Sequence, residues 1–185
     1  MRYFDDMLRI LRLDDGLWAE LSRDPRVMRY AVANVLVLGL IYGVSALYFS
    51  QRLLVAKGFS PEATNLNAAM VVLVGASVAF LMHGGLALFT WVFCRGIGGA
   101  VVFLHLYLSM GAAVLALWPA APAVALLQSG GRGVPLVLYL AASVGYGLAA
   151  QYPAVRRASG LSHPRMVAAG IFTLFYIGCF LYLWL

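Results

Sequence analysis

Five long apolar stretches fill most of the chain beyond residue 27, with few charged residues between them. They are Met28–Ser50, Leu66–Cys94, Gly99–Leu127, Val134–Tyr152 and Met166–Leu185. A helix of about 20 apolar residues crosses a bilayer, and in hydrocarbon every backbone polar group must be paired within the spanning structure. The stretches therefore predict an all-α, polytopic membrane bundle of five transmembrane helices.

The composition supports this class and leaves little room for another domain. Of 185 residues, 63% are hydrophobic and 11% are charged, whereas soluble domains carry about 25% charged residues. Strands of a membrane barrel would alternate apolar and polar residues, and these stretches do not. We expect two parts, an arm over residues 1–27 and a transmembrane domain over residues 28–185.

The arm has apolar residues at helical spacing. Phe4, Met7, Leu8 and Leu11 are followed, after an interruption at residues 14–16, by Leu17, Trp18 and Leu21. Spacings of three and four residues place such side chains on one face of a helix. An amphipathic helical arm is predicted, which would either pack under the bundle or offer a site to a partner.

Prolines shape the third and fourth stretches. The third is about 30 residues long, more than a bilayer needs, and Pro119 and Pro122 interrupt it. We expect a span over residues 99–118 and a broken or re-entrant extension to residue 127. Pro153 is expected to end the fourth span, 134–152, and the other spans are expected at 28–50, 66–94 and 166–185.

The basic residues predict the orientation. With a cytoplasmic N-terminus, ten would lie inside: Arg2, Arg9, Arg12, Arg23, Arg26, Arg29, Arg95, Arg156, Arg157 and Arg165. Only Arg52, Lys57 and Arg132 would lie outside. Because cytoplasmic loops carry the excess of Lys and Arg, the N-terminus is expected in the cytoplasm and the C-terminus outside. The excess positive charge lies beside the spans, which argues against a nucleic-acid partner.

Small residues at close spacing predict helix contacts. Gly39 and Gly43 form a GxxxG pattern, and Ala112, Ala116 and Gly145 repeat small-residue spacing in later spans. Small residues let helices approach closely in lipid. Contacts within the bundle are preferred over homodimerisation, because five helices have many internal interfaces.

Intramembrane polar residues are few. No Asp or Glu lies in any predicted span, which argues against an enzyme, a proton-coupled carrier and a carboxylate metal site. Asn34, His83 and His105 remain as candidates. His83 and His105 could both ligate one haem iron, but a hairpin would leave them about 9 Å apart in depth. Separate interhelical hydrogen bonds, with no cofactor and no metal, are the preferred interpretation.

Four arginines are candidates for an anion site at the inner face: Arg95, Arg156, Arg157 and Arg165. Arginine near an anionic membrane surface attracts lipid headgroups. The preferred function is a non-enzymatic protein that binds membrane lipid or another membrane protein there. The alternatives are a small solute transporter or channel-like bundle, in which His83 and the broken third span line a path, and an accessory subunit of a larger membrane complex.

Several segments carry a family resemblance. They are the arm ending at Trp18–Pro25, the five spans, the glycine-rich turn Phe93–Gly99 and the basic segment Val155–Ser162. Together they resemble a bacterial member of the Yip (Ypt-interacting protein) family. The resemblance implies a helical bundle without known chemistry, in a bacterial cytoplasmic membrane. Eukaryotic relatives act with small GTPases in vesicle traffic, but this arm lacks a long GTPase-facing region, so such a partner is not expected.

Overall fold

The computed structural model describes residues 2–21, 24–60 and 68–184, and the regular elements in them are helices. Two short helices, α1 (Arg2–Leu11) and α2 (Asp15–Leu21), precede the long ones. The long helices are α3 (Arg26–Ala56), α4 (Ala68–Gly96), α7 (Val134–Ser159) and α8 (His163–Trp184). Between α4 and α7 lie α5 (Phe103–Ala113), the short 3-10 helix η1 (Val114–Leu117) and α6 (Ala120–Gln128).

Several of these helices are long and apolar enough to cross a membrane. In the described part of the chain, α3, α4 and α7 meet that requirement singly. A further pair, residues 103–117 with α6, meets it jointly, although the two halves are bent by 74°. Three such helices, or four with the bent pair as one span, are compatible with an integral membrane protein.

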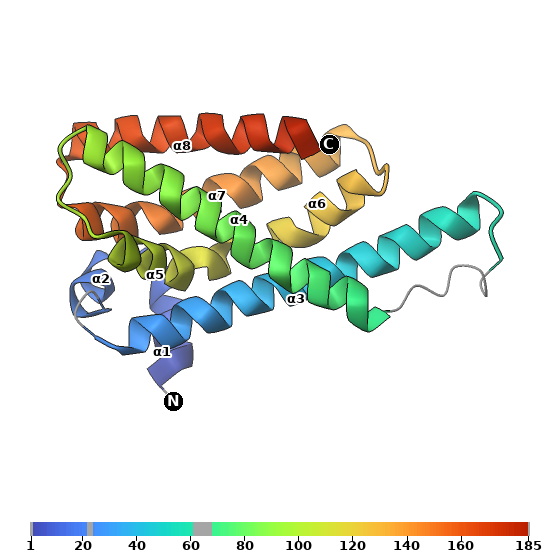
Figure 1. The fold of residues 1–185 in the computed structure, drawn as a ribbon, viewed down its shortest axis with the longest axis horizontal. Helices are drawn as coiled ribbons and strands as arrows, with labels where there is room; N and C mark the ends of the chain where they lie inside the picture. Colours follow the sequence, from blue (N-terminus) through green and yellow to red (C-terminus); the bar gives the residue numbers. More distant parts are fainter. Residues whose placement is uncertain (1, 22–23, 61–67, 185) are drawn as a thin grey trace.

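The long helices run broadly along the length of the molecule, and α3 and α4 cross each other (Figure 1). The start of α3, the ends of α4 and α7 and the start of α8 lie toward one end of the molecule, which we call the arginine end. The C-terminus of the chain lies toward the other end, near the connection between α6 and α7. The N-terminus lies under the start of α3.

Close backbone approach holds α3 against α4. A Cβ atom added to Gly39 would lie 2.6 Å from the Cα of Ala76, and one added to Gly43 would lie 2.9 Å from the Cα of Val72. Distances below 3.0 Å exclude a side chain without a backbone shift. The glycine spacing seen in the sequence therefore lies directly in this interface.

The small residues of the later helices are not all at interfaces. Ala112 and Ala116 are fully buried. On α7, however, the close contact lies at Gly147, where an added Cβ would collide with Leu117, while an added Cβ at Gly145 meets nothing within 4 Å. Gly145 was predicted to pack, but two residues along a helix rotate the side-chain position to a nearly opposite face.

The N-terminal helices pack on the bundle. Ile10, Leu17, Trp18 and Leu21 are buried in a cluster with Tyr30 and other residues of the long helices. These buried side chains join α1 and α2 to the rest of the structure. Ion pairs from Arg9 to Asp14 at 2.7 Å and to Glu20 at 3.1 Å hold the N-terminal segment together, and an ion pair from Arg157 of α7 to Asp15 at 2.9 Å joins it to the bundle.

Helix α7 continues past Pro153, where the sequence predicted its end at residue 152. The helix runs on to Ser159 and stops at Gly160, which adopts φ +66° and donates its N–H to the carbonyl of Arg156. A left-handed glycine is a common helix terminator. The missing N–H of a proline removes one hydrogen bond, which does not by itself end a helix.

The third stretch breaks where its prolines predicted. Helix α5 passes into η1, and Pro119 precedes α6, which turns away by 74°. The start of α5 is later than the predicted residue 99, because residues 97–102 form a connection. In that connection Gly98 has φ +95°, and the N–H of Ala100 donates to the carbonyl of Ser159 at 3.2 Å.

Candidate functional site

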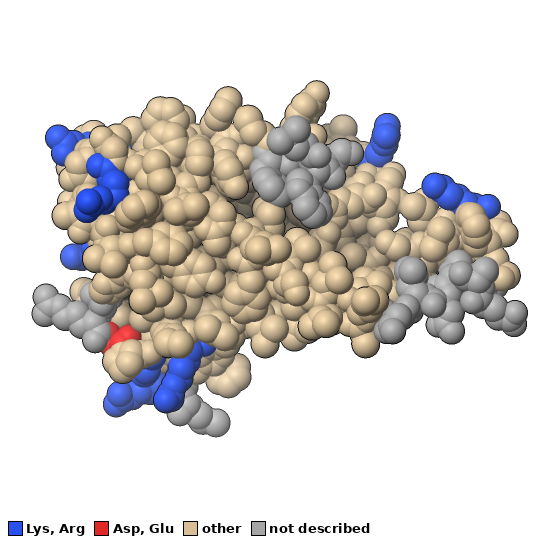
Figure 2. Space-filling view, in the orientation of Figure 1, with Lys and Arg blue, Asp and Glu red and all other residues tan. Residues whose placement is uncertain are grey.

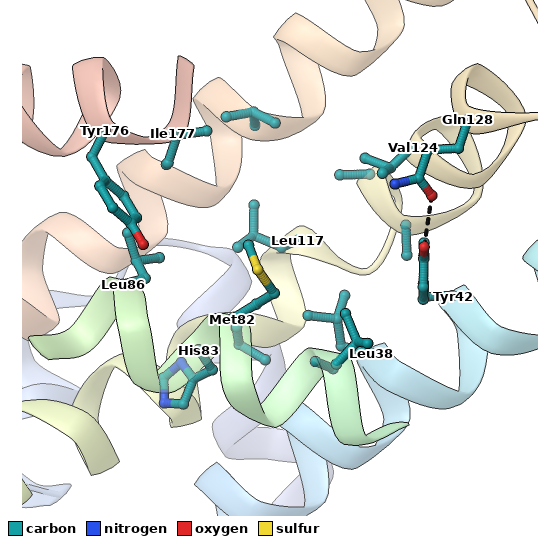
Figure 3. Close-up of a pocket in the computed structure, with 16 residues that line it drawn as sticks. Leu38, Tyr42, Met82, His83, Leu86, Leu117, Val124, Gln128, Tyr176 and Ile177 are labelled. Carbon is teal, nitrogen blue, oxygen red and sulfur yellow. Dashed lines mark hydrogen bonds between the residues drawn. The ribbon is translucent and has the colours of Figure 1, made fainter. Parts of the chain in front are cut away.

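An apolar cavity lies beside the break in the third stretch (Figure 3). It has a volume of about 220 Å³, is partly open to the outside and is lined by 16 residues. Leu38 of α3, Met82 of α4, Leu117 of η1, Val124 of α6 and Ile177 of α8 all face it. We call this space the His83 cavity. It depends on the packing of elements from nearly the whole chain.

The bend itself forms one side of the cavity. Val114 and Leu117 line it before Pro119, and Ala120, Ala121 and Val124 line it after the turn. A straight helix would present one continuous stripe of side chains, whereas the bent pair presents two surfaces at 74°. The proline break thus shapes the cavity as well as the path of the chain.

The polar groups at the wall are few and uncharged. They are Tyr42, His83, Gln128 and Tyr176 among otherwise apolar residues. The hydroxyl of Tyr42 donates to Oε1 of Gln128 at 2.6 Å, so these two side chains satisfy each other (Figure 3). An ionic ligand would find no counter-charge on this wall, whereas hydrocarbon would be compatible with it.

His83 is a buried polar residue of this wall. The side chain is 3% exposed, and its Nε2 lies 3.0 Å from the carbonyl oxygen of Tyr107. A carbonyl only accepts, so we assign the hydrogen to Nε2, which makes Nδ1 an acceptor. Nδ1 is buried without a hydrogen-bond partner in the described part of the chain.

A glycine on α5 permits this contact. A Cβ atom added to Gly111 would lie 3.1 Å from Nε2 of His83 and 2.8 Å from the Cβ of Ala31. Any larger residue at position 111 would push the imidazole away from α5. The imidazole is therefore positioned by the backbone of α5.

Asn34 has a structural role and does not line the cavity. It is fully buried, and its Nδ2 donates to the carbonyl of Ala112 at 2.8 Å. Its Oδ1 accepts from the hydroxyl of Tyr3 at 2.6 Å, and its main-chain oxygen accepts from Nε1 of Trp118 at 3.1 Å. This one residue joins α1, α3, α5 and the segment before α6.

The two intramembrane histidines are not brought together. His83 contacts the carbonyl of Tyr107, whereas His105 is exposed. Positions two apart on a helix point in nearly opposite directions, so the face of α5 that meets His83 is not the face of His105. In the described ranges, His, Cys, Asp and Glu form no group of three that could hold a metal ion.

The four predicted arginines lie together at the arginine end but differ in their surroundings. On the face shown in Figure 2, the basic side chains lie toward the two ends of the molecule. Arg157 is engaged by Asp15, as described above. Arg95, Arg156 and Arg165 have no acidic side chain within 4 Å among the residues that the structure describes.

Asp6 and Gln151 are among the buried polar residues that the sequence analysis missed. Asp6 of α1 is 7% exposed, and its Oδ2 accepts from the hydroxyl of Tyr30 at 2.8 Å. Gln151 of α7 is 3% exposed, and its Nε2 has no partner among described residues. An amide in an otherwise apolar stretch could have been identified as a buried polar residue. The helix was predicted to end at residue 152, however, which placed Gln151 at the end of the span.

Comparisons with models of protein families, with curated proteins and with solved structures found no match for this chain. The resemblance to the Yip family therefore stays a prediction from the sequence.

Proposed function

We propose that this chain is a non-enzymatic membrane protein that binds an uncharged lipid in the His83 cavity. The hydrocarbon of the ligand would occupy the apolar space, and its hydroxyl group would donate to Nδ1 of His83. One observation carries the proposal, namely that an apolar cavity is lined by His83, whose Nδ1 is buried without a partner among the described residues. Lipid binding was also expected from the sequence, but at the arginines of the inner face. The site proposed here lies between the helices of the bundle.

The histidine supplies the selectivity in this proposal. Hydrocarbon gains little on moving from a bilayer into an apolar cavity, because lipid tails are as apolar as the wall. A buried polar atom without a partner costs free energy, and a ligand that satisfies it recovers that cost. A lipid with one hydroxyl group is therefore preferred over one without any donor.

The wall favours binding over catalysis. A hydrolytic site needs a nucleophile beside a base that is oriented by a third group. The cavity offers one imidazole, whose Nε2 is already used by Tyr107, together with two phenols and one amide. These groups suit recognition of a hydroxyl.

Five spans are proposed, with α8 as the fifth beside α3, α4, the bent pair and α7. Helix α8 is 22 residues long and runs alongside α7 in Figure 1. The arginine end would face the cytoplasm of a bacterial cell, which places the N-terminus inside and the C-terminus outside. The basic side chains gathered at that end support this orientation.

The test compares two ligands that differ by one hydrogen-bond donor. Purified protein is titrated with hexadecanol and with hexadecyl methyl ether. One hydrogen bond of about 1 kcal/mol predicts about fivefold tighter binding of the alcohol. His83→Leu removes the Nδ1 acceptor and offers no other, so it should bind both equally. Equal binding by the unchanged protein would contradict the proposal.

A transporter is the second candidate, and the 74° bend beside the cavity favours it. Discontinuous helices often mark binding sites in transporters. Lipid scrambling or solute flux in proteoliposomes, abolished when the cavity is filled, would support transport over static binding.

A role as subunit of a larger complex predicts instead a defined partner that co-purifies in mild detergent.

A further inference from the structure

A second cavity lies between α7 and α8, nearer the arginine end. Its volume is about 410 Å³, and it shares no lining residue with the His83 cavity. Its wall includes Gln151 and Val155 of α7, Met166 and Thr173 of α8 and Thr90 of α4. We call this space the Gln151 groove. Any ligand of the groove is thus independent of the ligand proposed above.

Gln151, which lines the groove, carries a buried donor without a partner among the described residues. Nε2 of Gln151 is an amide nitrogen, which donates two hydrogen bonds and accepts none. The residue is 3% exposed, and Nε2 has no partner in the described part of the chain. The neighbouring hydroxyls are already used locally, Thr90 donating to the carbonyl of Leu86 and Thr173 to that of Ala169. A ligand oxygen, such as a carbonyl, would satisfy this donor.

Two arginines are next in the chain to residues that line the groove. Val155 and Met166 line it, and the residues next to them in the chain are Arg156 and Arg165. Neither arginine has an acidic partner within 4 Å among the described residues. Arg165 lies against the loop at Gly98, where its Nη1 would be 3.1 Å from an added Cβ.

The spacing along α7 matches an amphiphile with three parts. Gln151 and Arg156 are five residues apart, which is about 7.5 Å along the helix axis and about 140° around it. The long side chain of Arg156 must therefore curve around α7 to reach the groove. An anionic phospholipid has a phosphate at the membrane surface, an ester carbonyl a few bonds deeper and then hydrocarbon. The arginines, the amide and the apolar wall occur in this same order of depth.

We propose that the Gln151 groove binds an anionic phospholipid from the leaflet at the arginine end. The phosphate contacts Arg156 and Arg165, an ester carbonyl accepts a hydrogen bond from Nε2 of Gln151, and the acyl chain lies between α7 and α8. Charge complementarity selects an anionic headgroup, and the buried amide selects an ester linkage. Inorganic phosphate would share the first contact and lack the other two.

The first experiment tests the headgroup. The protein is placed in nanodiscs of mixed phosphatidylglycerol and phosphatidylcholine, and the retained lipid is measured by native mass spectrometry. Arg156→Gln with Arg165→Gln should lower the preference for phosphatidylglycerol by about 30-fold. Arg52→Gln with Arg132→Gln removes the same charge at the opposite end and should leave the preference unchanged. Equal losses in both double variants would overturn the proposal.

The second experiment tests the ester contact. Ether-linked phosphatidylglycerol keeps the phosphate and lacks the carbonyl. The unchanged protein should retain the ester lipid about fivefold better, and Gln151→Met should remove this difference while keeping the preference for phosphatidylglycerol. If Gln151→Met does not fold, the comparison in the unchanged protein still decides. No ester preference there, or displacement of the lipid by inorganic phosphate alone, would overturn the proposal.

The two proposals fail separately. The alcohol comparison depends on His83, whereas the headgroup and ester comparisons depend on Arg156, Arg165 and Gln151. If the protein prefers hexadecanol but shows no ester preference, the proposed site in the His83 cavity is supported and the proposed site in the Gln151 groove is contradicted. If it shows an ester preference but no preference for hexadecanol, only the groove site is supported.

Discussion

Nε2 of His83 lies 3.0 Å from the carbonyl oxygen of Tyr107, so a buried imidazole on α4 is fixed to the backbone of α5. The contact leaves the other ring nitrogen buried without a partner in the described structure, on a side chain that lines the cavity. One side chain thus joins two helices and provides an acceptor for a ligand, and different variants can separate these roles.

His83→Leu removes both ring nitrogens, whereas His83→Gln keeps an amide donor for the carbonyl of Tyr107. We expect the leucine variant to lose about 1 kcal/mol of stability and the glutamine variant to lose less, since interhelical hydrogen bonds in membranes average about 0.6 kcal/mol. Thermal unfolding in a mild detergent measures both. A leucine variant as stable as the glutamine variant would contradict a role for the Tyr107 contact.

Gly39→Ala should loosen the contact between α3 and α4. The added methyl group would lie 2.6 Å from the Cα of Ala76, which is backbone and cannot move aside alone. Overpacking of this kind costs about 1–3 kcal/mol. Gly84→Ala is the matched control, because an added Cβ there meets nothing within 4 Å. Unfolding in increasing concentrations of a denaturing detergent should show Gly39→Ala to be clearly less stable than Gly84→Ala. Equal stability of the two variants would contradict a close contact at Gly39.

Asn34→Leu should affect both the bundle and the N-terminal helices. It removes the donor to the Ala112 carbonyl and leaves the hydroxyl of Tyr3 without its acceptor. We expect a loss of about 1 kcal/mol in stability, together with faster hydrogen exchange in α1. Tyr3→Phe removes only the contact with α1, so it should increase exchange in α1 and have a smaller effect on unfolding. Unchanged exchange in α1 in both variants would exclude this link.

Acid should weaken the N-terminal helices. The hydrogen bonds from Arg9 hold the pKa of Asp14 and the pKa of Glu20 below their ordinary values. A lowered carboxyl pKa contributes stability that is present above the ordinary value, near 4. That stability is lost as the pH falls through the lowered pKa.

Limited proteolysis or hydrogen exchange of α1 and α2 between pH 6 and pH 3 measures this effect, at about constant ionic strength. Protection should fall toward the acidic end in the unchanged protein and change less with pH in Arg9→Gln. The effect should be small, because the ion pairs are largely exposed. An identical pH dependence in the two proteins would contradict the assignment to Arg9.

Much of the fold could be predicted from local patterns. Apolar length located the long helices, Pro119 located the break after η1, and the spacing of Gly39 and Gly43 located a close contact. These features depend on short-range rules, because a helix needs a continuous apolar run and a proline interrupts hydrogen bonding. The ends of the elements were less predictable, since α7 passes Pro153 and stops at Gly160.

The candidate sites depend on tertiary structure and were only partly visible in the sequence. Gly147 packs against η1 and Gly145 does not, because only one side of α7 faces η1. The spacing of small residues in the sequence does not show how a helix is rotated about its axis. The His83 cavity combines side chains from six elements around a 74° bend. His83 itself was found as an intramembrane polar residue, but its free nitrogen depends on the position of the Tyr107 carbonyl.

The most direct test of lipid binding in the His83 cavity is native mass spectrometry of protein extracted gently from its membrane. The unchanged protein should carry an uncharged, hydroxyl-bearing lipid. Val124→Trp fills the cavity and should remove that lipid, whereas Val137→Trp makes the same change on an exposed position of α7 and should retain it. The same lipid retained equally by all three proteins would contradict the account.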